Sequence, residues 1–179
     1  MNFSKFIFQK IWGWTILGDF KKDTIKKAVI IVVPHTSWVD FWVAILTRKS
    51  LKTPVNFIAK KELFTWPFGY YFRWMGGAAL DRTPGQNKVQ AIAKIFDTKD
   101  EFRLALSPEG TRKKVTEWKT GYYYIAYTAK VPIIPVSLNY KTKTVTFYEP
   151  FYPTGNIKAD TKKIKLYFKG IVGKVAENS

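Results

Sequence analysis

A histidine and an aspartate stand five residues apart, directly after an apolar run of β-branched residues. The run is Val29–Val33, and His35 is the only histidine in the chain of 179 residues. Because neighbours on a helix face lie three or four residues apart, we expect His35 in a loop and Asp40 in the first helical turn that follows. The carboxylate would then bind one imidazole nitrogen and leave the other as a general base. The alternative is a structural histidine.

Two further polar segments follow apolar runs. Asp81 and Arg82 come after residues 77–80, and a loop at 107–112 combines a carboxylate, a glycine, hydroxyls and a guanidinium. Arginine forks, backbone amides and hydroxyls are suited to phosphate. Taken alone, each segment can also be a charged surface turn. The segment Val131–Val136, with two prolines, predicts a buried strand.

Short β-branched runs alternate with amphipathic stretches, and this pattern predicts a single α/β domain with a mixed sheet covered by helices. Sites in such sheets lie in loops beyond the strand ends. The expected strands are 29–33, 55–59, 77–80, 103–106, 133–138 and 144–148, and the expected helices are 38–47, 87–97, 121–128 and 158–175.

The composition narrows the functional classes. Thirty basic and 13 acidic residues give a net charge of +17, which indicates an anionic partner such as a nucleic acid, a phospholipid surface or a phosphorylated substrate. The absence of cysteine excludes disulfides, cysteine-ligated metals and thiol nucleophiles, and a single histidine excludes multi-histidine metal sites.

Two aromatic segments suggest contact with a membrane. Residues 1–20 predict an amphipathic interfacial helix ahead of a domain at 21–179, and the alternative is a helix packed on the domain core. The segment Phe64–Trp74 predicts either a membrane-facing ridge or acyl-chain groove, or a buried helix. No uninterrupted apolar run in the sequence approaches the roughly 20 residues that cross a bilayer, and Lys5 and Lys10 interrupt the first segment.

These segments, in this order, resemble the four sequence blocks of the glycerophospholipid acyltransferase family, which includes lysophosphatidate acyltransferases. The matching segments are His35 to Asp40, Asp81–Arg82, Pro108–Arg112 and Val131–Val136. Lys119, with Gly121, resembles the family's Lys-x-Gly between the third and fourth blocks. The resemblance covers about residues 28–138 and is closest to a compact bacterial subgroup, although Pro34 stands where many members have asparagine.

The resemblance implies a glycerol-3-phosphate acyltransferase-like fold and an acyl transfer without cofactor or metal. His35, held by Asp40, would deprotonate a hydroxyl of a lysophospholipid or glycerol phosphate, which attacks the thioester of acyl-CoA or acyl-carrier protein. The residues expected to bind the substrate phosphate are Arg82, Glu109, Gly110, Thr111 and Arg112, with Lys119 as a further substrate contact.

The same resemblance implies a peripheral or monotopic enzyme on the cytoplasmic face of the inner membrane, bound to its anionic surface. The alternative from the charge is a basic nucleic acid-binding module without catalytic activity. The sequence has no zinc, helix-turn-helix or RRM pattern, so we expect no specific nucleic acid partner.

Overall fold

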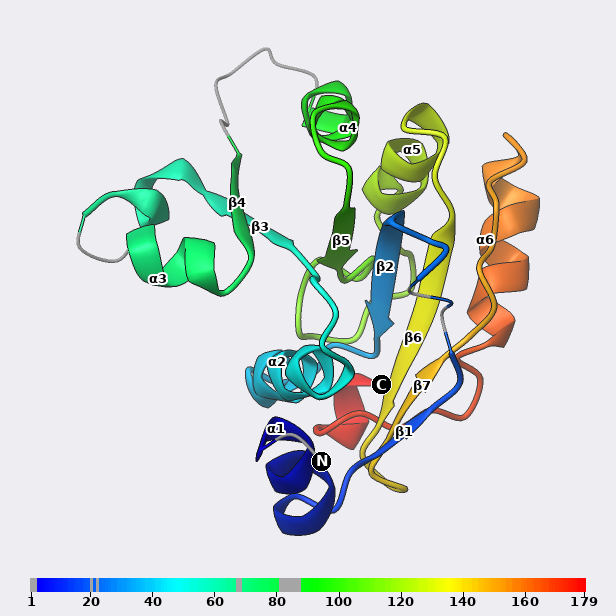
Figure 1. Cartoon of the computed structure of the whole chain (residues 1–179). Helices are drawn as coiled ribbons and strands as arrows, with labels where there is room; N and C mark the ends of the chain where they lie inside the picture. The colour runs from blue at the N-terminus through cyan, green and yellow to red at the C-terminus, as the bar shows by residue number, and fades with distance from the viewer. Residues whose placement is uncertain (1–2, 20, 22, 67–68, 81–87) are drawn as a thin grey trace.

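The main sheet has five strands. The computed structural model describes residues 3–19, 21, 23–66, 69–80 and 88–179 (Figure 1). The strand order is β1-β7-β6-β2-β5, with only β6 and β7 antiparallel among the neighbouring pairs of this sheet. The strands are β1 (Thr15–Leu17), β2 (Lys27–Val33), β5 (Phe102–Leu106), β6 (Ile133–Asn139) and β7 (Thr144–Phe147).

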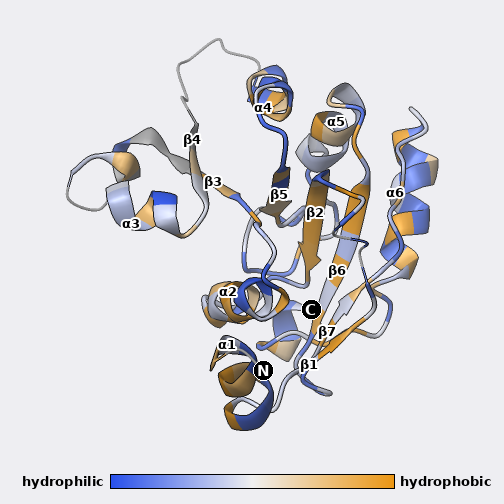
Figure 2. Cartoon of the chain, viewed as in Figure 1, coloured by the Kyte–Doolittle hydropathy of each residue, from blue (hydrophilic) through white to orange (hydrophobic). Residues whose placement is uncertain are grey.

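Strand β2 lies in the sheet interior and is buried on both faces. Val29 and Ile31 pack into one core with α4 (Lys88–Asp97) and α5 (Gly121–Thr128), whereas Ala28 and Ile30 pack into a second core with α2 (Val39–Leu51). A parallel strand covered on both faces reads as a continuous apolar run. Figure 2 accordingly shows β2 and β6 as hydrophobic strands between the helices. The predicted mixed, helix-covered α/β architecture is confirmed.

The N-terminal helix is shorter than the expected span of residues 1–20. Helix α1 (Phe3–Phe6) continues into a π-helical turn, η1 (Ile7–Ile11), and Gly13 then adopts a left-handed conformation that ends the helix. Strand β1 follows and pairs with β7, so this part of residues 1–20 belongs to the main sheet. Phe8 and Trp14 are buried in the core beside α2.

Two of the expected strands form a separate small sheet. Strands β3 (Phe57–Lys60) and β4 (Gly77–Leu80) pair in parallel, with the short helices η2 (Lys61–Phe64) and α3 (Gly69–Trp74) between them. A single bridge from Asn56 to Leu104 links this unit to β5. Figure 1 shows the unit extending beyond that edge of the main sheet.

The C-terminal helix α6 (Ile157–Leu166) is shorter than the expected range 158–175. Asn156 caps its start by accepting a hydrogen bond from the Ala159 amide at 3.1 Å. Beyond the helix, Gly170 has a positive φ, and the chain runs to a short 3-10 turn, η3 (Ala176–Asn178). The prediction was wrong here because two glycines, which disfavour helix, follow the amphipathic stretch. Within the described residues, no helix combines the length and apolarity needed to cross a bilayer.

Candidate active site

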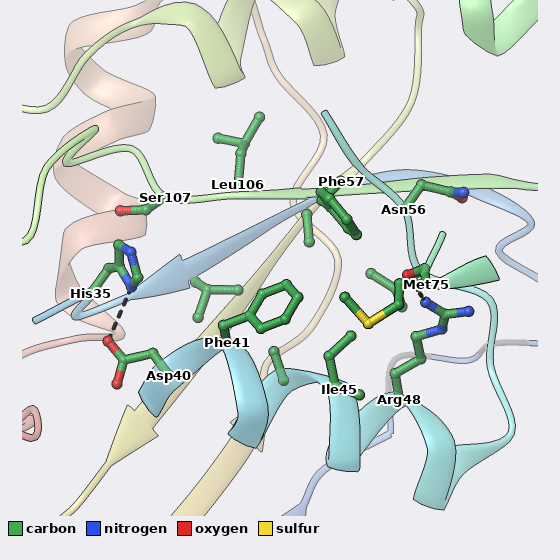
Figure 3. A pocket seen from close by; sticks show the side chains of 14 residues that line it. His35, Asp40, Phe41, Ile45, Arg48, Asn56, Phe57, Met75, Leu106 and Ser107 are labelled. Atoms are coloured by element: carbon green, nitrogen blue, oxygen red, sulfur yellow. Dashed lines mark hydrogen bonds and ion pairs between the residues drawn. The ribbon is translucent and has the colours of Figure 1, made fainter. Parts of the chain in front are cut away.

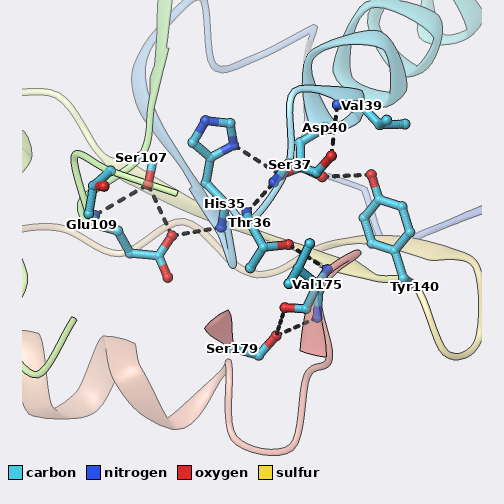
Figure 4. Close-up of polar contacts among 12 residues, drawn as sticks. His35, Thr36, Ser37, Val39, Asp40, Ser107, Glu109, Tyr140, Val175 and Ser179 are labelled. Carbon is cyan, nitrogen blue, oxygen red and sulfur yellow. Dashed lines mark hydrogen bonds and ion pairs between the residues drawn. The ribbon is translucent and has the colours of Figure 1, made fainter. Parts of the chain in front are cut away.

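His35 and Asp40 meet at the end of β2. His35 lies in the loop between β2 and α2, and Asp40 lies in the first turn of α2, as the spacing predicted. His35 Nδ1 is 3.0 Å from Asp40 Oδ2 (Figure 4). The Asp40 side chain is 2% exposed and that of His35 is 33% exposed. The pair is therefore anchored on one side and open to a substrate on the other.

The main chain fixes the Asp40 carboxylate. The backbone amides of Thr36 and Ser37 each donate a hydrogen bond of 2.9 Å to Oδ2, the oxygen that also binds His35. An ionised carboxylate only accepts hydrogen bonds, so it holds the proton of the imidazole on Nδ1. The Nε2 atom of His35 is then the unprotonated nitrogen that can act as a base.

Tyr140 completes the environment of Asp40. Its hydroxyl donates a hydrogen bond of 2.6 Å to Oδ1 of the carboxylate. Burial raises the pKa of the Asp40 carboxyl, but the hydrogen bonds from His35, Tyr140 and Ser37 outweigh burial and leave this pKa below its usual value. Burial and the neighbouring Asp40 carboxylate raise the pKa of the Tyr140 phenol. The pair therefore persists as an ionised aspartate and a neutral tyrosine.

Glu109 lies against the main chain of the catalytic loop. Its Oε2 accepts a hydrogen bond of 2.6 Å from the His35 amide and one of 3.2 Å from the Ser107 hydroxyl. Burial raises the pKa of the Glu109 carboxyl, although these hydrogen bonds partly oppose the effect. The sequence placed Glu109 among the phosphate-binding residues, whereas these contacts hold the backbone of His35.

The other sequence-predicted residues fall into three groups. Lys119 lies directly over Gly110, where an added Cβ would come within 2.7 Å of the Lys119 side chain, so the two motifs adjoin. Thr111 is half-buried and Arg112 is exposed at the same loop. Arg82 lies outside the described residues, as does its neighbour Asp81.

An apolar cavity of about 190 Å³ opens beside His35 and Asp40 (Figure 3). Its polar lining includes His35 and Ser107 at one end and Arg48, which hydrogen-bonds the Met75 carbonyl, at the other. The apolar lining comprises Val32, Phe41, Ala44, Ile45, Val55, Phe57, Met75, Ala105 and Leu106. A narrower cavity of about 50 Å³ shares several lining residues with the first, namely Val32, Ala44, Arg48, Val55 and Ala105. Together they form an apolar space that starts at His35.

The C-terminal segment also supports the catalytic loop. The Val175 amide donates a hydrogen bond of 3.1 Å to the Thr36 hydroxyl. Gly173 is packed so closely that an added Cβ would lie 2.6 Å from the same oxygen. The Tyr140 amide donates to the Val172 carbonyl at 2.8 Å. The loop that carries His35 is therefore braced by residues far away in the sequence.

Comparison with known proteins assigns residues 18–139 to a protein family. That range matches the family model described as Acyltransferase. The chain belongs to this acyltransferase family. The matched range runs through the end of β6 and contains His35, Asp40, Glu109 and Lys119. Family membership confirms the prediction of an O-acyltransferase, and nothing in the comparisons supports the nucleic acid-binding alternative.

Several relatives of this acyltransferase carry a more specific name. A probable 1-acyl-sn-glycerol-3-phosphate acyltransferase of Mycoplasma genitalium is 25% identical over 97% of this chain and 69% of its own length. One from Mycoplasma pneumoniae is 35% identical over 74% of this chain, and the enzyme from Saccharomyces cerevisiae is 28% identical over 79%. The chain spans only 52% and 46% of the lengths of these last two.

The fold has a counterpart of known structure. The 1-acyl-sn-glycerophosphate (LPA) acyltransferase PlsC from Thermotoga maritima aligns with a TM-score of 0.63 at 22% sequence identity. The alignment covers 93% of this acyltransferase and 74% of that chain. The aligned share is larger than residues 18–139, so the likeness in fold extends beyond the range matched by the family model.

The sequence interpretation missed Tyr140 and the C-terminal brace. Tyr140 directly follows β6, and β6 is parallel to β2, so both strands end at the same edge of the sheet as His35. A tyrosine at the end of a predicted neighbouring strand was the available signal. Nothing in the sequence around Val175 indicated a contact with Thr36.

Proposed function

We propose that this acyltransferase moves a fatty acyl group from acyl-CoA or acyl-carrier protein to the free hydroxyl of a lysophospholipid, with 1-acylglycerol 3-phosphate as the leading acceptor. The observation that carries the proposal is the His35–Asp40 pair at the mouth of an apolar cavity. The names of the relatives supply the acceptor class. The required chemistry needs no resident cofactor.

In this mechanism, His35 Nε2 accepts the proton of the acceptor hydroxyl while Asp40 stabilises the imidazolium. The resulting oxygen nucleophile attacks the thioester carbonyl carbon, and a tetrahedral oxyanion forms. The carbon–sulfur bond then breaks, and the thiolate takes the proton back from Nε2. The products are an ester and a free thiol, and the base is regenerated.

The surroundings of His35 suggest where each substrate lies. The apolar lining of the cavity, including Phe41, Ile45 and Phe57, suits the hydrocarbon chain of the donor. The loop with Thr111, Arg112 and the adjoining Lys119 offers a hydroxyl and two cations for the acceptor phosphate. Glu109 acts on this arrangement indirectly, by holding the His35 amide.

We place the enzyme on the cytoplasmic face of the inner membrane as a peripheral or monotopic protein. Large apolar side chains are exposed on α1 and around α3, among them Phe3 at 78%, Trp66 at 91% and Trp74 at 65%. Exposed aromatic rings favour the interface of a bilayer, and a net charge of +17 favours anionic headgroups.

The deciding experiment offers labelled acyl-CoA and a panel of lysophospholipids to the wild-type protein and to the variant His35→Ala, with products identified by mass spectrometry. Loss of the base should lower turnover by roughly 100- to 10,000-fold. The companion variant Asp40→Asn keeps the side-chain shape but removes the charge, and it should also lose most turnover. Near-normal transfer by His35→Ala, with an unchanged melting temperature, would refute the mechanism.

A further inference from the structure

A third cavity, larger than the two beside His35, adjoins the loop that carries His35 and is lined by lysines. It has a volume of about 470 Å³ and shares no lining residue with the apolar cavity beside His35. Pro34, which directly precedes His35, lines it together with Glu109 and Trp118. Its cationic lining consists of Lys162, Lys165 and Lys169. These lysines lie outside the range matched by the acyltransferase family.

The lysines follow from the pattern of α6. Lys158, Lys162 and Lys165 recur at intervals of four and three residues, which places them on one face of the helix. Asp160 and Ile164 are buried against the domain. Figure 2 shows hydrophilic residues along α6. Of these three lysines, Lys162 and Lys165 line the cavity, and Lys169 joins them from the chain beyond the end of α6.

The positive charge on the lining of this cavity exceeds its negative charge, which comes from Glu109 and the main-chain carboxylate of Ser179. In the described part of the chain, Lys162, Lys165 and Lys169 form no ion pair. The Lys165 ammonium lies 5.3 Å from the ring centroid of Trp118. Glu109 is the one acidic residue among the described lining residues, and its carboxylate accepts from the His35 amide. The cavity is therefore suited to an anion with several charges.

We propose that this cavity binds the phosphates at the nucleotide end of a CoA thioester, an inference that rests on the proposed acyl transfer. Its volume is in the range of pockets for small molecules, about 300–1,000 Å³. A concave site of this size is better suited to a nucleotide than to the surface of a partner protein. Its three lining lysines, Lys162, Lys165 and Lys169, offer more positive charge than one phosphate group requires, so they match the diphosphate and the 3′-phosphate together.

The position of the cavity is compatible with reaction at His35. Pro34 and Glu109 belong to its lining, and Glu109 contacts the His35 amide at 2.6 Å. The pantetheine arm of CoA separates its phosphates from its thioester by a long flexible chain. Phosphates held beside Pro34 therefore leave the thioester free to reach the imidazole.

The test compares the wild-type protein with the variant Lys162→Ala/Lys165→Ala/Lys169→Ala. The donors are acyl-CoA, acyl-carrier protein and an S-acylpantetheine, which carries the same thioester without the nucleotide. We expect the KM for acyl-CoA to rise about tenfold, since each exposed cation contributes modestly. The kcat and the kinetics with S-acylpantetheine should be unchanged. The matched variant Lys26→Ala/Lys94→Ala/Lys99→Ala removes the same charge at exposed positions outside α6 and should leave every donor unaffected.

Other outcomes overturn the assignment. An equal rise in the KM for S-acylpantetheine would exclude recognition of the nucleotide. A rise confined to the KM for the lysophospholipid would assign the lysines to the acceptor phosphate. A rise confined to the KM for acyl-carrier protein would make them a protein-docking surface. Calorimetry with adenosine 3′,5′-bisphosphate gives a readout without turnover. Binding to wild type that is lost in the triple variant supports the proposal even if no acyl transfer is found, in which case only the proposed function fails.

Discussion

The hydroxyl of Tyr140 lies 2.6 Å from Oδ1 of Asp40 and donates to it from a position outside the four sequence blocks. Trp14 packs edge-on against the Tyr140 ring at 4.8 Å between centroids, and the Lys174 ammonium lies 5.8 Å from the same ring. The N-terminal and C-terminal segments thus converge on Tyr140 at the end of β6. Tyr140 in turn contacts Asp40, the residue that orients His35.

Removing this hydroxyl should slow catalysis without weakening substrate binding. In Tyr140→Phe, the Asp40 carboxylate loses one of its donors and holds the imidazole less firmly. We expect kcat to fall about 10- to 100-fold while KM changes by less than about twofold, because one hydrogen bond to a charged group contributes on the order of 1.5–3 kcal/mol. Steady-state kinetics with acyl-CoA measures both parameters.

Tyr148→Phe is the matched control, since it removes a tyrosine hydroxyl that contacts Ser137 elsewhere in the sheet. It should retain wild-type kcat. If Tyr140→Phe costs as much activity in an Asp40→Asn background as in the wild type, Tyr140 does not act through Asp40.

The buried Glu109 carboxyl predicts a pH-dependent stability. Burial raises its folded-state pKa above the ordinary value of 4.5, so the folded protein favours the protonated form. The associated stabilisation is present below pH 4.5 and is lost as pH rises through the folded-state pKa. Glu109→Gln does not ionise. Its stability relative to that of the wild type should therefore be greater at pH 7 than at pH 4. Urea unfolding at both values measures the difference, and Glu117→Gln at an exposed site serves as control.

A pH-independent difference between Glu109→Gln and wild type would contradict the raised pKa. The amide oxygen of glutamine can still accept from the His35 amide, so the loop should keep its place. Any loss of activity then reports the missing charge rather than a displaced backbone.

Filling the apolar cavity should change donor selectivity. Ala44 is half-buried and lines both the larger and the narrower cavity. Ala44→Leu adds three carbons at this junction, so it should lower kcat/KM about tenfold for long-chain acyl-CoA and leave short-chain donors within about twofold. A competition assay with mixed chain lengths gives the ratio directly. An equal loss of kcat/KM for all chain lengths would exclude this cavity as the acyl site. The control Ala159→Leu makes the same substitution at an exposed position of α6 and should leave kcat/KM unchanged.

The exposed aromatic side chains near α3 should contribute to membrane binding. Trp66 and Tyr70 are 91% and 86% exposed. In Trp66→Ala/Tyr70→Ala, we expect several-fold weaker sedimentation with anionic vesicles at low salt, and high salt should weaken the wild type as well. Tyr152→Ala removes an aromatic residue that is 63% exposed beyond β7 and should have no effect. Wild-type indifference to vesicle charge would contradict electrostatic attraction to the bilayer.

The sequence predicted those features that depend on neighbouring residues. The run at 29–33 gave β2, and the five-residue spacing put His35 in a loop and Asp40 on a helix. The N-terminal helix was overestimated because its aromatic pattern continues past Gly13, where the backbone turns. The family resemblance grouped Glu109 with the phosphate ligands, and its contact with the His35 amide was missed because the two residues are 74 positions apart. Such long-range pairings leave no periodic trace in one sequence.

The small sheet of β3 and β4 separates part of the cavity wall from the elements that carry His35 and Asp40. Phe57 and Met75 from that unit form part of the wall around the apolar cavity, while His35 and Asp40 stand on the main sheet and α2. Asn56 forms a β-bridge between the unit and the main sheet, and Ile58 and Ala78 pack against the main core. Under the proposed function, substitutions there would change which fatty acids are accepted while the His35–Asp40 pair stays intact, so that selectivity and reactivity could diverge separately in evolution.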